Sequence, residues 1–285
     1  MSRPLAALLA GAACIALSPI FVRLSEAGPT ATAFWRVALA VAPLWLLWRL
    51  REPRAAVRYA SRMRLLGVAG FAFAGDLAFW HLSIRYTSVA NSTLLANLAS
   101  IFVTLAAWLF LRERPTGLFL AGLASALAGV GLLVSTSLSF SGTALLGDAM
   151  GVATAAFYAG YIFAVKELRE RGETVLGLMA TTSAITAALL LPVAIVSGET
   201  LLPHSAWGWS VLLGLALVSH AGGQGLIAYA LAHLPAAFSS VTLLLQPVLA
   251  ALFAWALLGE TLVPLQIAGG LVVLAGIYIA RTGSR

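Results

Sequence analysis

Charged residues are scarce in this chain of 285 residues. Asp, Glu, Lys and Arg together make up only 9% of it, whereas soluble proteins carry about a quarter. Apolar residues account for 61% of the chain, and its mean hydropathy is +0.98. So few charges cannot cover the surface of a soluble domain of this length. An ordinary water-soluble protein is therefore excluded, and we expect lipid to surround most of the chain.

Cysteine and the common catalytic motifs are also lacking. The single cysteine, Cys14, excludes an intramolecular disulfide. The sequence contains no Gly-x-Ser-x-Gly, no His-Glu-x-x-His, no Gly-Lys-Ser/Thr phosphate loop and no Cys/His cluster. The only lysine, Lys166, falls at the end of an expected helix and does not suit a buried cofactor-linking amine. We therefore expect no enzyme active site, no cofactor, no metal and no ATP site.

Long apolar runs are what the sequence has instead. A membrane-spanning helix needs about 20 mainly apolar residues. The first run follows Arg3 and resembles a secretory signal, and Gly11–Cys14 weakly resembles a lipoprotein site; the polytopic chain that follows favours an uncleaved first helix. Runs separated by Gly, Pro or charged residues predict ten spans, near 5–24, 30–49, 65–84, 89–111, 116–135, 145–166, 174–197, 207–230, 235–258 and 263–281.

The positions of Lys and Arg predict the orientation. Cytoplasmic loops of membrane proteins carry an excess of these residues. With the N-terminus inside, only Arg23, Arg36 and Arg85 fall toward the outer side. The basic pI of 10.3 is then a topology signal and not a nucleic-acid footprint. The other 14 of the 17 basic residues are cytoplasmic: Arg3, Arg49, Arg51, Arg54, Arg58, Arg62, Arg64, Arg112, Arg114, Lys166, Arg169, Arg171, Arg281 and Arg285.

The sequence repeats itself with a shift of 147 residues. Ten identities fall in the 25 positions 107–131, and they include Trp108 with Trp255 and Glu113 with Glu260. We therefore expect two units, 1–138 and 139–285, of five spans each. Because five is odd, the second unit must cross the membrane upside down relative to the first. Inverted units can open a central site to either side in turn; a duplicated scaffold that only holds helices together is the alternative.

Several short motifs resemble those of a known family. They are Pro29 with Phe34-Trp35-Arg36, Tyr86–Ala90, Gln246-Pro247 and the segments around Glu113 and Glu260. In this order they resemble the EamA family of the drug/metabolite transporter superfamily over essentially the whole chain. The resemblance implies ten helices, cytoplasmic termini, a central cavity and export of metabolites. The amino-acid exporters that accept aromatic substrates are the most similar members in general character.

Asp76 is the most conspicuous candidate for binding substrate. A charge in mid-membrane costs about 2.5–3.5 kcal/mol, so a retained one faces a cavity or a partner. Phe79 and Trp80 lie on the same side of the expected helix. Asp76 could bind a substrate amino group or a proton, or it could hydrogen-bond a neighbouring helix, with Arg36 as one partner. His81 also falls in this span, although it suits a structural hydrogen bond.

Four other spans contribute candidates. Thr93, Asn97, Ser100 and Thr104 form a polar stripe that lines the cavity or bonds to another helix. Tyr158 in span 6 could contact an apolar substrate group or face lipid. His220 and Gln224 are one helical turn apart in span 8, within a glycine-rich run that permits close packing or backbone exposure to a ligand. Gln246 precedes Pro247 in span 9, and this proline either kinks the span or frees a carbonyl for substrate.

The predicted function is secondary export of small metabolites. We expect amino acids, aromatic ones included, to cross a bacterial inner membrane by alternating access, driven by a substrate gradient, exchange or an ion gradient. The expected partners are the bilayer and a small-molecule substrate, and a monomer suffices. An intramembrane enzyme that uses Asp76, His81 or His220 on lipid-borne substrates is one rival. A passive channel and a transporter of drugs, nucleosides or sugars are others.

Overall fold

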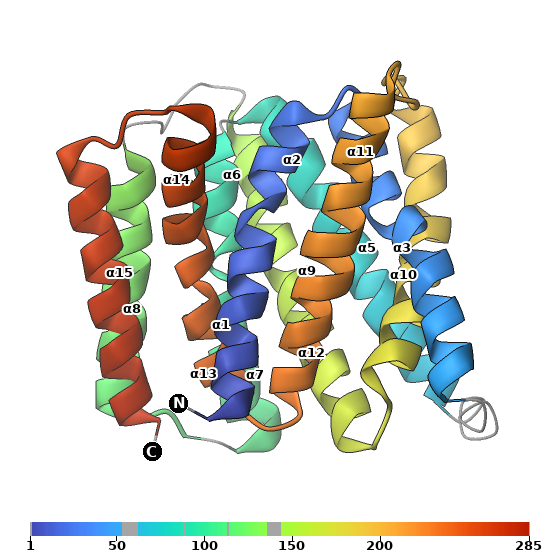
Figure 1. Cartoon of the computed structure of the whole chain (residues 1–285). Coiled ribbons are helices and arrows are strands. Elements are labelled where there is room, and N and C mark those ends of the chain that lie inside the picture. The colour runs from blue at the N-terminus through green and yellow to red at the C-terminus, as the bar shows by residue number, and fades with distance from the viewer. Residues whose placement is uncertain (1, 53–61, 88, 113, 136–143, 285) are drawn as a thin grey trace.

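The computed structural model describes residues 2–52, 62–87, 89–112, 114–135 and 144–284, and helices are the regular elements of these ranges (Figure 1). Within the described chain, ten helical stretches are long and apolar enough to cross a membrane. The number and order of spans predicted from the sequence are thus confirmed, and the chain is a multi-pass membrane protein. Ser88, Glu113, Arg54, Arg58, Arg285 and the predicted unit boundary at 138 lie outside the described residues.

Six of the ten spans, numbered in chain order, are continuous helices. Pro43 and Pro192 lie inside two of these helices without breaking them. The continuous spans are span 2, α3 (Pro29–Arg51); span 3, α5 (Met63–Tyr86); span 5, α8 (Gly117–Val134); span 6, α9 (Ala144–Glu170); span 7, α10 (Val175–Val196); and span 10, α15 (Pro264–Gly283).

The other four spans are divided into segments. Span 1 consists of α1 (Arg3–Ala16) and α2 (Ser18–Leu24), and span 4 of α6 (Val89–Ala96) and α7 (Ala99–Leu111). Span 8 consists of α11 (Ala206–Gly214), the π-helix η3 (Leu215–Gln224) and α12 (Gly225–Leu231). Span 9 consists of α13 (Ala236–Leu243) and α14 (Leu245–Leu258).

Each interruption has a local cause. Pro19 and Pro247 fall in the first turn of α2 and of α14, where the missing backbone N–H has no partner to lose. Span 4 is interrupted without a proline. There Asn97 Nδ2 donates to the carbonyl of Thr93 at 2.7 Å, which offers the backbone an alternative to the helical ladder. In η3 the hydrogen bonds run to the fifth residue and widen the turn.

Corresponding positions of spans 4 and 9 share their backbone geometry. The interruption at Asn97 falls 147 residues before the one at Leu244. Likewise α7 ends on Arg112 with φ 57° and α14 ends on Gly259 with φ 69°, again 147 residues apart. Arg112 is the one non-glycine residue of the described ranges with positive φ. A helix ending in the left-handed conformation normally uses glycine, so the copy in span 9 is the less strained of the two.

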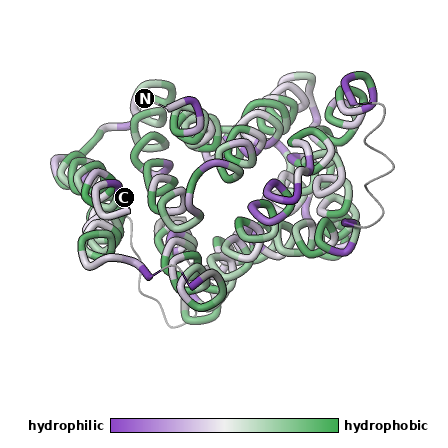
Figure 2. Tube along the Cα trace, turned by 90° about the horizontal axis from the view of Figure 1, so that it is seen from below, coloured by the Kyte–Doolittle hydropathy of each residue, from purple (hydrophilic) through white to green (hydrophobic). Residues whose placement is uncertain are grey.

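Helices α8 and α15 pack side by side at one edge of the bundle (Figures 1 and 2). A Cβ atom at Gly122 would lie 2.7 Å from the carbonyl oxygen of Gly276, and one at Gly129 would lie 2.8 Å from that of Gly269. Because the earlier glycine of α8 meets the later one of α15, the two helices run antiparallel. The 147-residue shift turns Gly122 into Gly269 and Gly276 into Gly129, so it exchanges these two contacts.

Apolar side chains form two buried clusters. The larger cluster is centred on spans 2, 3, 6, 7 and 8 and contains Phe73, Tyr161 and Leu178. The smaller one draws on spans 5, 9 and 10 and contains Phe119, Val241 and Val273. The clusters therefore do not coincide with the two sequence halves. Large apolar side chains such as Phe110 and Val196 are exposed on the outside of the bundle, as expected of a surface that faces lipid.

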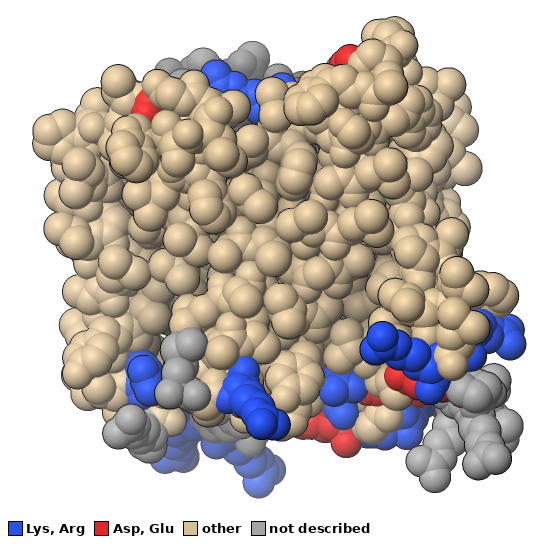
Figure 3. Space-filling view, in the orientation of Figure 1, with Lys and Arg blue, Asp and Glu red and all other residues tan. Residues whose placement is uncertain are grey.

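The two ends of the bundle differ in charge. Both termini lie at one end, which we call the terminal end (Figure 1). Most of the visible Lys and Arg side chains gather there, while the middle of the molecule shows a wide uncharged belt (Figure 3). This distribution is the pattern that the positive-inside rule associates with a cytoplasmic face.

Candidate functional site

A cavity of about 180 Å³ opens where seven spans meet. Spans 1, 2, 3, 4, 6, 8 and 9 contribute to it, so both sequence halves build its wall. Its lining consists of Ile15, Ala16, Ser18, Pro19, Arg36, Asp76, Leu77, Trp80, Thr93, Ala96, Asn97, Thr154, Tyr158, Gln224, Gln246, Pro247 and Ala250.

Three of the interrupted spans place their breaks at the cavity. Ser18 and Pro19 follow the break in span 1, and Asn97 marks the break in span 4. Gln246 and Pro247 follow the break in span 9. Broken helices at mid-membrane are tolerated where they line a cavity, because the freed backbone groups find partners or water there.

The structure brings together at this cavity seven of the ten residues predicted to form the site. They reach it from spans 3, 4, 6, 8 and 9, which are far apart in the sequence. These residues are Asp76, Trp80, Thr93, Asn97, Tyr158, Gln224 and Gln246.

Phe79 and His81 lie off the cavity, contrary to the sequence prediction. Successive residues of an α-helix are turned by about 100°, and Asp76 and Trp80 define the face of α5 that lines the cavity. Phe79 points to one side of that face and stacks on Phe157, with 5.4 Å between ring centroids. His81 points to the other side, where its Nδ1 lies 2.7 Å from the carbonyl oxygen of Leu77.

His220 is also absent from the cavity lining. Its Nε2 lies 2.7 Å from Ser183 Oγ on α10, and its ring stacks on Phe73 at a centroid distance of 5.4 Å. His220 therefore joins spans 3, 7 and 8 inside the larger apolar cluster. The prediction paired it with Gln224 as one helical turn apart, but the wider turn of η3 changes which side chains share a face.

Several lining residues were missed in the predicted site. Span 1 supplies four, including Ser18 and Pro19, although its sequence looked like a plain apolar helix. Pro19 was the available signal, because it interrupts span 1 as Pro247 interrupts span 9. Thr154, one turn before Tyr158, was detectable by helical spacing. The sequence suggests Arg36 only as a partner of Asp76, and the structure places it in the cavity wall.

Four buried polar atoms at the cavity have no hydrogen-bond partner among the described residues. They are Ser18 Oγ, Arg36 Nε, Gln224 Oε1 and Gln246 Nε2, one from each of spans 1, 2, 8 and 9. Buried polar groups in proteins are almost always hydrogen-bonded, because leaving one unpaired costs about 1–3 kcal/mol. Four such atoms around one cavity indicate a site that is completed by a polar ligand or by water.

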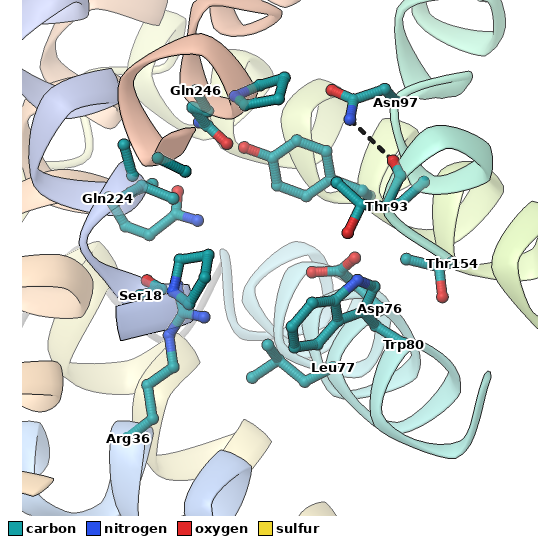
Figure 4. A pocket seen from close by; sticks show the side chains of 17 residues that line it. Ser18, Arg36, Asp76, Leu77, Trp80, Thr93, Asn97, Thr154, Gln224 and Gln246 are labelled. Carbon is teal, nitrogen blue, oxygen red and sulfur yellow. Dashed lines mark hydrogen bonds between the residues drawn. The ribbon is translucent and has the colours of Figure 1, made fainter. Parts of the chain in front are cut away.

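The cavity carries one basic and one acidic side chain. Arg36 is only 7% exposed, and Asp76 is half-buried. Figure 4 shows the guanidinium of Arg36 and the carboxylate of Asp76 facing the same central space from opposite sides. The two side chains share the lining of one cavity, yet no ion pair of the described residues joins them.

The polar stripe of span 4 largely satisfies itself. Ser100 Oγ donates to the carbonyl of Asn97 at 2.9 Å, and Thr104 Oγ1 donates to that of Ser100 at 2.7 Å. Only Thr93 and Asn97 of the stripe line the cavity. Ser100 and Thr104 thus bond to their own helix. The sequence predicted that they would line the cavity or bond to another helix.

Small residues allow the spans around the cavity to approach closely. A Cβ atom at Gly151 in α9 would lie 2.9 Å from Leu95 Cβ, and one at Gly147 would lie 2.7 Å from the amide of Thr87. Ser83 Oγ donates to the carbonyl of Gly147 at 2.7 Å. In span 8, a Cβ atom at Gly223 would lie 2.7 Å from Ile15 of span 1. These glycines therefore act in helix packing.

Polar contacts join the two halves at the end opposite the termini. Arg23 forms an ion pair with Glu260. Glu26 Oε1 accepts a hydrogen bond from Ser205 Oγ at 2.5 Å, and Glu26 Oε2 accepts from the amide of His204 at 2.8 Å. Hydrogen bonds from Ser205 and the neighbouring amides lower the pKa of Glu26 below its usual value.

Comparison with known proteins gives concordant matches. The EamA-like transporter family matches residues 3–135 and 145–282. The pseudopaline exporter CntI of Pseudomonas aeruginosa is 27% identical over 96% of this chain and 95% of its own length. The threonine/homoserine exporter RhtA of Escherichia coli is 29% identical over 96% of this chain and 86% of its own length.

Two further matches extend the comparison. A probable terminal-alkyne amino-acid exporter of Streptantibioticus cattleyicolor is 32% identical over 85% of this chain and 78% of its own length. One crystal structure superposes with a TM-score of 0.83 at 17% identity, covering 100% of this chain and 99% of the other. At that identity the structural match establishes the fold alone.

Proposed function

The chain belongs to the EamA-like transporter family of the drug/metabolite transporter superfamily, and from this membership we propose that it exports small amino-acid-like metabolites across the cytoplasmic membrane. The observation that carries the proposal is the cavity between the two halves, with four buried polar atoms that lack partners. Such a site in the middle of ten spans suits a polar solute on its way through the bilayer.

The substrate class is proposed from the relatives and from the size of the cavity. Two of the relatives are named for exporting amino acids and a third for exporting pseudopaline. Pockets for drug-sized ligands measure roughly 300–1,000 Å³, so a cavity of about 180 Å³ favours a small metabolite. Trp80 and Tyr158 in the lining offer aromatic surface to an apolar side chain, which keeps aromatic amino acids among the proposed substrates.

We further propose that transport proceeds by alternating access in a chain built of two inverted halves, 1–138 and 139–285, with both termini in the cytoplasm. The antiparallel pairing of α8 with α15 and its exchange of contacts under the 147-residue shift support the inversion. The matched helix ends at Arg112 and Gly259 support the duplication. The basic terminal end supports the orientation (Figure 3).

Counterflow in proteoliposomes tests this function. The purified chain is reconstituted, the vesicles are loaded with unlabelled compound, and uptake of labelled amino acids, nucleosides and sugars is followed. We expect transient accumulation of one or more amino acids with saturation. If nucleosides or sugars are exchanged and amino acids are not, the proposed substrate class is wrong.

The same preparation separates the rival functions. An intramembrane enzyme would convert a substrate in detergent, where no compartment exists, whereas a transporter leaves the compound chemically unchanged. A passive channel would show non-saturating flux and no counterflow. Product formation in detergent, or flux without counterflow, would replace the transporter proposal by the corresponding rival.

A further inference from the structure

We propose that Arg36 and Asp76 form a two-point site for a zwitterion, in which the guanidinium binds the α-carboxylate and the Asp76 carboxylate binds the α-ammonium group. This inference deepens the proposed export of amino-acid-like metabolites and rests on it for the class of solute. It assigns Arg36 to the site and predicts that both charged groups of the substrate are required.

Arg36 supplies the anion-binding end. Its side chain is 7% exposed, and its Nε has no hydrogen-bond partner among the described residues. Ser18 Oγ, another buried donor without a partner there, lies on the Arg36 side of the cavity in Figure 4. A guanidinium presents its N–H groups in a planar fork that matches a carboxylate. A ligand carboxylate at this end would therefore reach a buried guanidinium whose Nε donor has no partner among the described residues.

Asp76 supplies the cation-binding end. Its carboxylate faces the cavity from α5, on the wall across from Arg36, with Thr93 beside it in Figure 4. No ion pair of the described residues ends on Asp76, so its oxygens are available to a ligand. The two nearby imidazoles do not line the cavity, and each has a partner elsewhere, His81 with Leu77 and His220 with Ser183. Asp76 is thus the carboxylate that an ammonium group entering the cavity would meet.

Charge balance favours a zwitterion over either of its charged fragments. The lining holds one positive and one negative side chain, and a zwitterion keeps the sum of charges at zero. An amine without a carboxylate would leave a net positive charge, and an acid without an amine would leave a net negative one. A net charge inside a low-dielectric bundle is costly. Each analogue would therefore lose one ion pair and also leave a net charge in the cavity.

The rest of the lining sets which side chain is accepted. Trp80, Leu77, Pro247 and Ala250 are apolar, and the described lining holds no third charge. An acidic or basic substrate side chain would therefore have no counter-charge in the cavity. We expect neutral amino acids to be preferred over glutamate and lysine.

Competition experiments test the two-point site directly. L-leucine, 3-methylbutylamine and 4-methylpentanoate share one apolar side chain and differ in their charged groups. Binding to the purified protein in detergent and inhibition of labelled L-leucine counterflow are measured for each. We expect the amine and the acid to bind at least about tenfold more weakly than L-leucine. Equal binding of all three compounds would overturn the proposal.

Variants assign each charge to its residue. In Asp76→Asn the ammonium group of L-leucine loses its partner, so L-leucine should bind at least about tenfold more weakly. The acid 4-methylpentanoate no longer leaves an unpaired carboxylate in the site, so the advantage of L-leucine over it should shrink. In Arg36→Gln the advantage over 3-methylbutylamine should shrink instead, and Arg36→Lys should retain part of the affinity. Arg23→Gln, at an arginine outside the cavity, is the control and should keep the wild-type ratios. A uniform loss for all three compounds would mean a structural role and overturn the assignment.

The outcomes for the site and for export are distinguishable. Selective binding of L-leucine in detergent without counterflow would support the two-point site and contradict export. Counterflow of L-leucine with equal competition by the amine and the acid would support export and contradict the two-point site. If L-leucine, L-threonine and L-phenylalanine neither bind nor exchange, the two-point site is wrong.

Discussion

Gln246 is a cavity residue that we expect to contribute to substrate binding and not to folding stability. Its Nε2 is buried without a partner among the described residues. Replacing it with Met, which has a similar shape, removes an unsatisfied donor, so stability should be unchanged or rise by up to about 1 kcal/mol. Losing one substrate hydrogen bond of about 1 kcal/mol should raise KM about fivefold. Thermal unfolding in detergent and counterflow kinetics measure the two effects.

Thr242→Val provides the matched control for Gln246→Met. Thr242 lies in the same span, but its hydroxyl already donates to the carbonyl of Phe238 at 2.9 Å. Thr242 does not line the cavity. We therefore expect Thr242→Val to leave KM unchanged. A Gln246→Met variant with lower stability and an unchanged KM would show that Gln246 has a structural role.

Glu26 makes the contact between the halves dependent on pH. Because hydrogen bonds lower its pKa in the folded state, its contribution to stability is complete above the usual carboxyl pKa of about 4.3. That contribution is lost as the pH falls through the lowered value. We expect Glu26→Gln to unfold at a lower temperature than wild type at pH 7, and the difference to shrink below pH about 4.

Ser205→Ala tests the cause of this pH dependence. Ser205 supplies the hydroxyl that lies 2.5 Å from Glu26 Oε1, and its hydrogen bond is the largest contribution that lowers the pKa of Glu26. The variant should therefore reproduce part of the effect of Glu26→Gln in the same melting curves. A constant difference between wild type and Glu26→Gln across the acidic range would contradict the assignment.

At the level of single residues, the sequence indicates which side chains share a helix face but not whether that face points into the cavity. Asp76 and Trp80 were predicted together because they are four residues apart on one helix, and both line the cavity. Phe79 is three residues from Asp76 and satisfies the same rule, yet it packs on Phe157. Spacing fixes which side chains share a face, but the packing of distant spans decides where that face points.

At the level of elements, the ten spans were predictable and their interruptions were not. Apolar runs determine where helices cross a membrane, and ten such spans are present in the described chain. Pro19 and Pro247 mark two of the breaks, but proline alone does not identify the broken spans, since Pro43 and Pro192 lie in continuous helices while span 4 breaks at Asn97. The π-helix of span 8 had no sequence signal that we recognised. These features depend on what neighbouring helices offer to freed backbone groups.

The contact between α8 and α15 predicts opposite effects for two glycines of one helix. A Cβ atom at Gly122 would lie 2.7 Å from both Ala280 Cα and the Gly276 carbonyl oxygen, which are backbone atoms that cannot turn aside. At Gly131 no described atom lies within 4 Å of that position. We expect Gly122→Ala to destabilise the protein by about 1–3 kcal/mol. Gly131→Ala should be neutral or stabilise it by about 0.5–1 kcal/mol.

Thermal unfolding of the two variants in the same detergent measures this difference. Gly131→Ala acts as the internal control, because it makes the same chemical change in the same helix. Equal melting temperatures for both variants would mean that α8 and α15 do not approach as closely as the structure places them.

At the scale of the whole molecule, the moving bodies need not be the two halves of the sequence. One apolar cluster is centred on spans 2, 3, 6, 7 and 8, and the other on spans 5, 9 and 10. Packed cores resist deformation and tend to move as units. If the cavity opens to the two sides in turn, as proposed, we expect the relative motion to occur between these clusters, with the broken spans 1, 4 and 9 bending at the cavity. Each body would then contain spans from both halves.

If the two halves are inverted, corresponding segments of the chain must lie on opposite sides of the membrane. Arg114 and Thr261 follow the matched spans 4 and 9, so inverted halves require them to face opposite sides of the membrane. The natural cysteine, Cys14, is replaced with Ser, and single cysteines are introduced at Arg114, Leu202, Thr261 and Ser284, all of which are exposed. Intact cells are then treated with a membrane-impermeant maleimide, before and after permeabilisation.

We expect the cysteines at 202 and 261 to react in intact cells, and those at 114 and 284 only after permeabilisation. The physical reason is the basic terminal end, which the positive-inside rule keeps in the cytoplasm, together with an odd number of spans between positions 114 and 261. Reaction at 114 and 284 in place of 202 and 261 would reverse the orientation but keep the inversion. Reaction at both 114 and 261 from the same side would contradict the inversion itself, and the alternating exposure of the cavity would lose its structural basis.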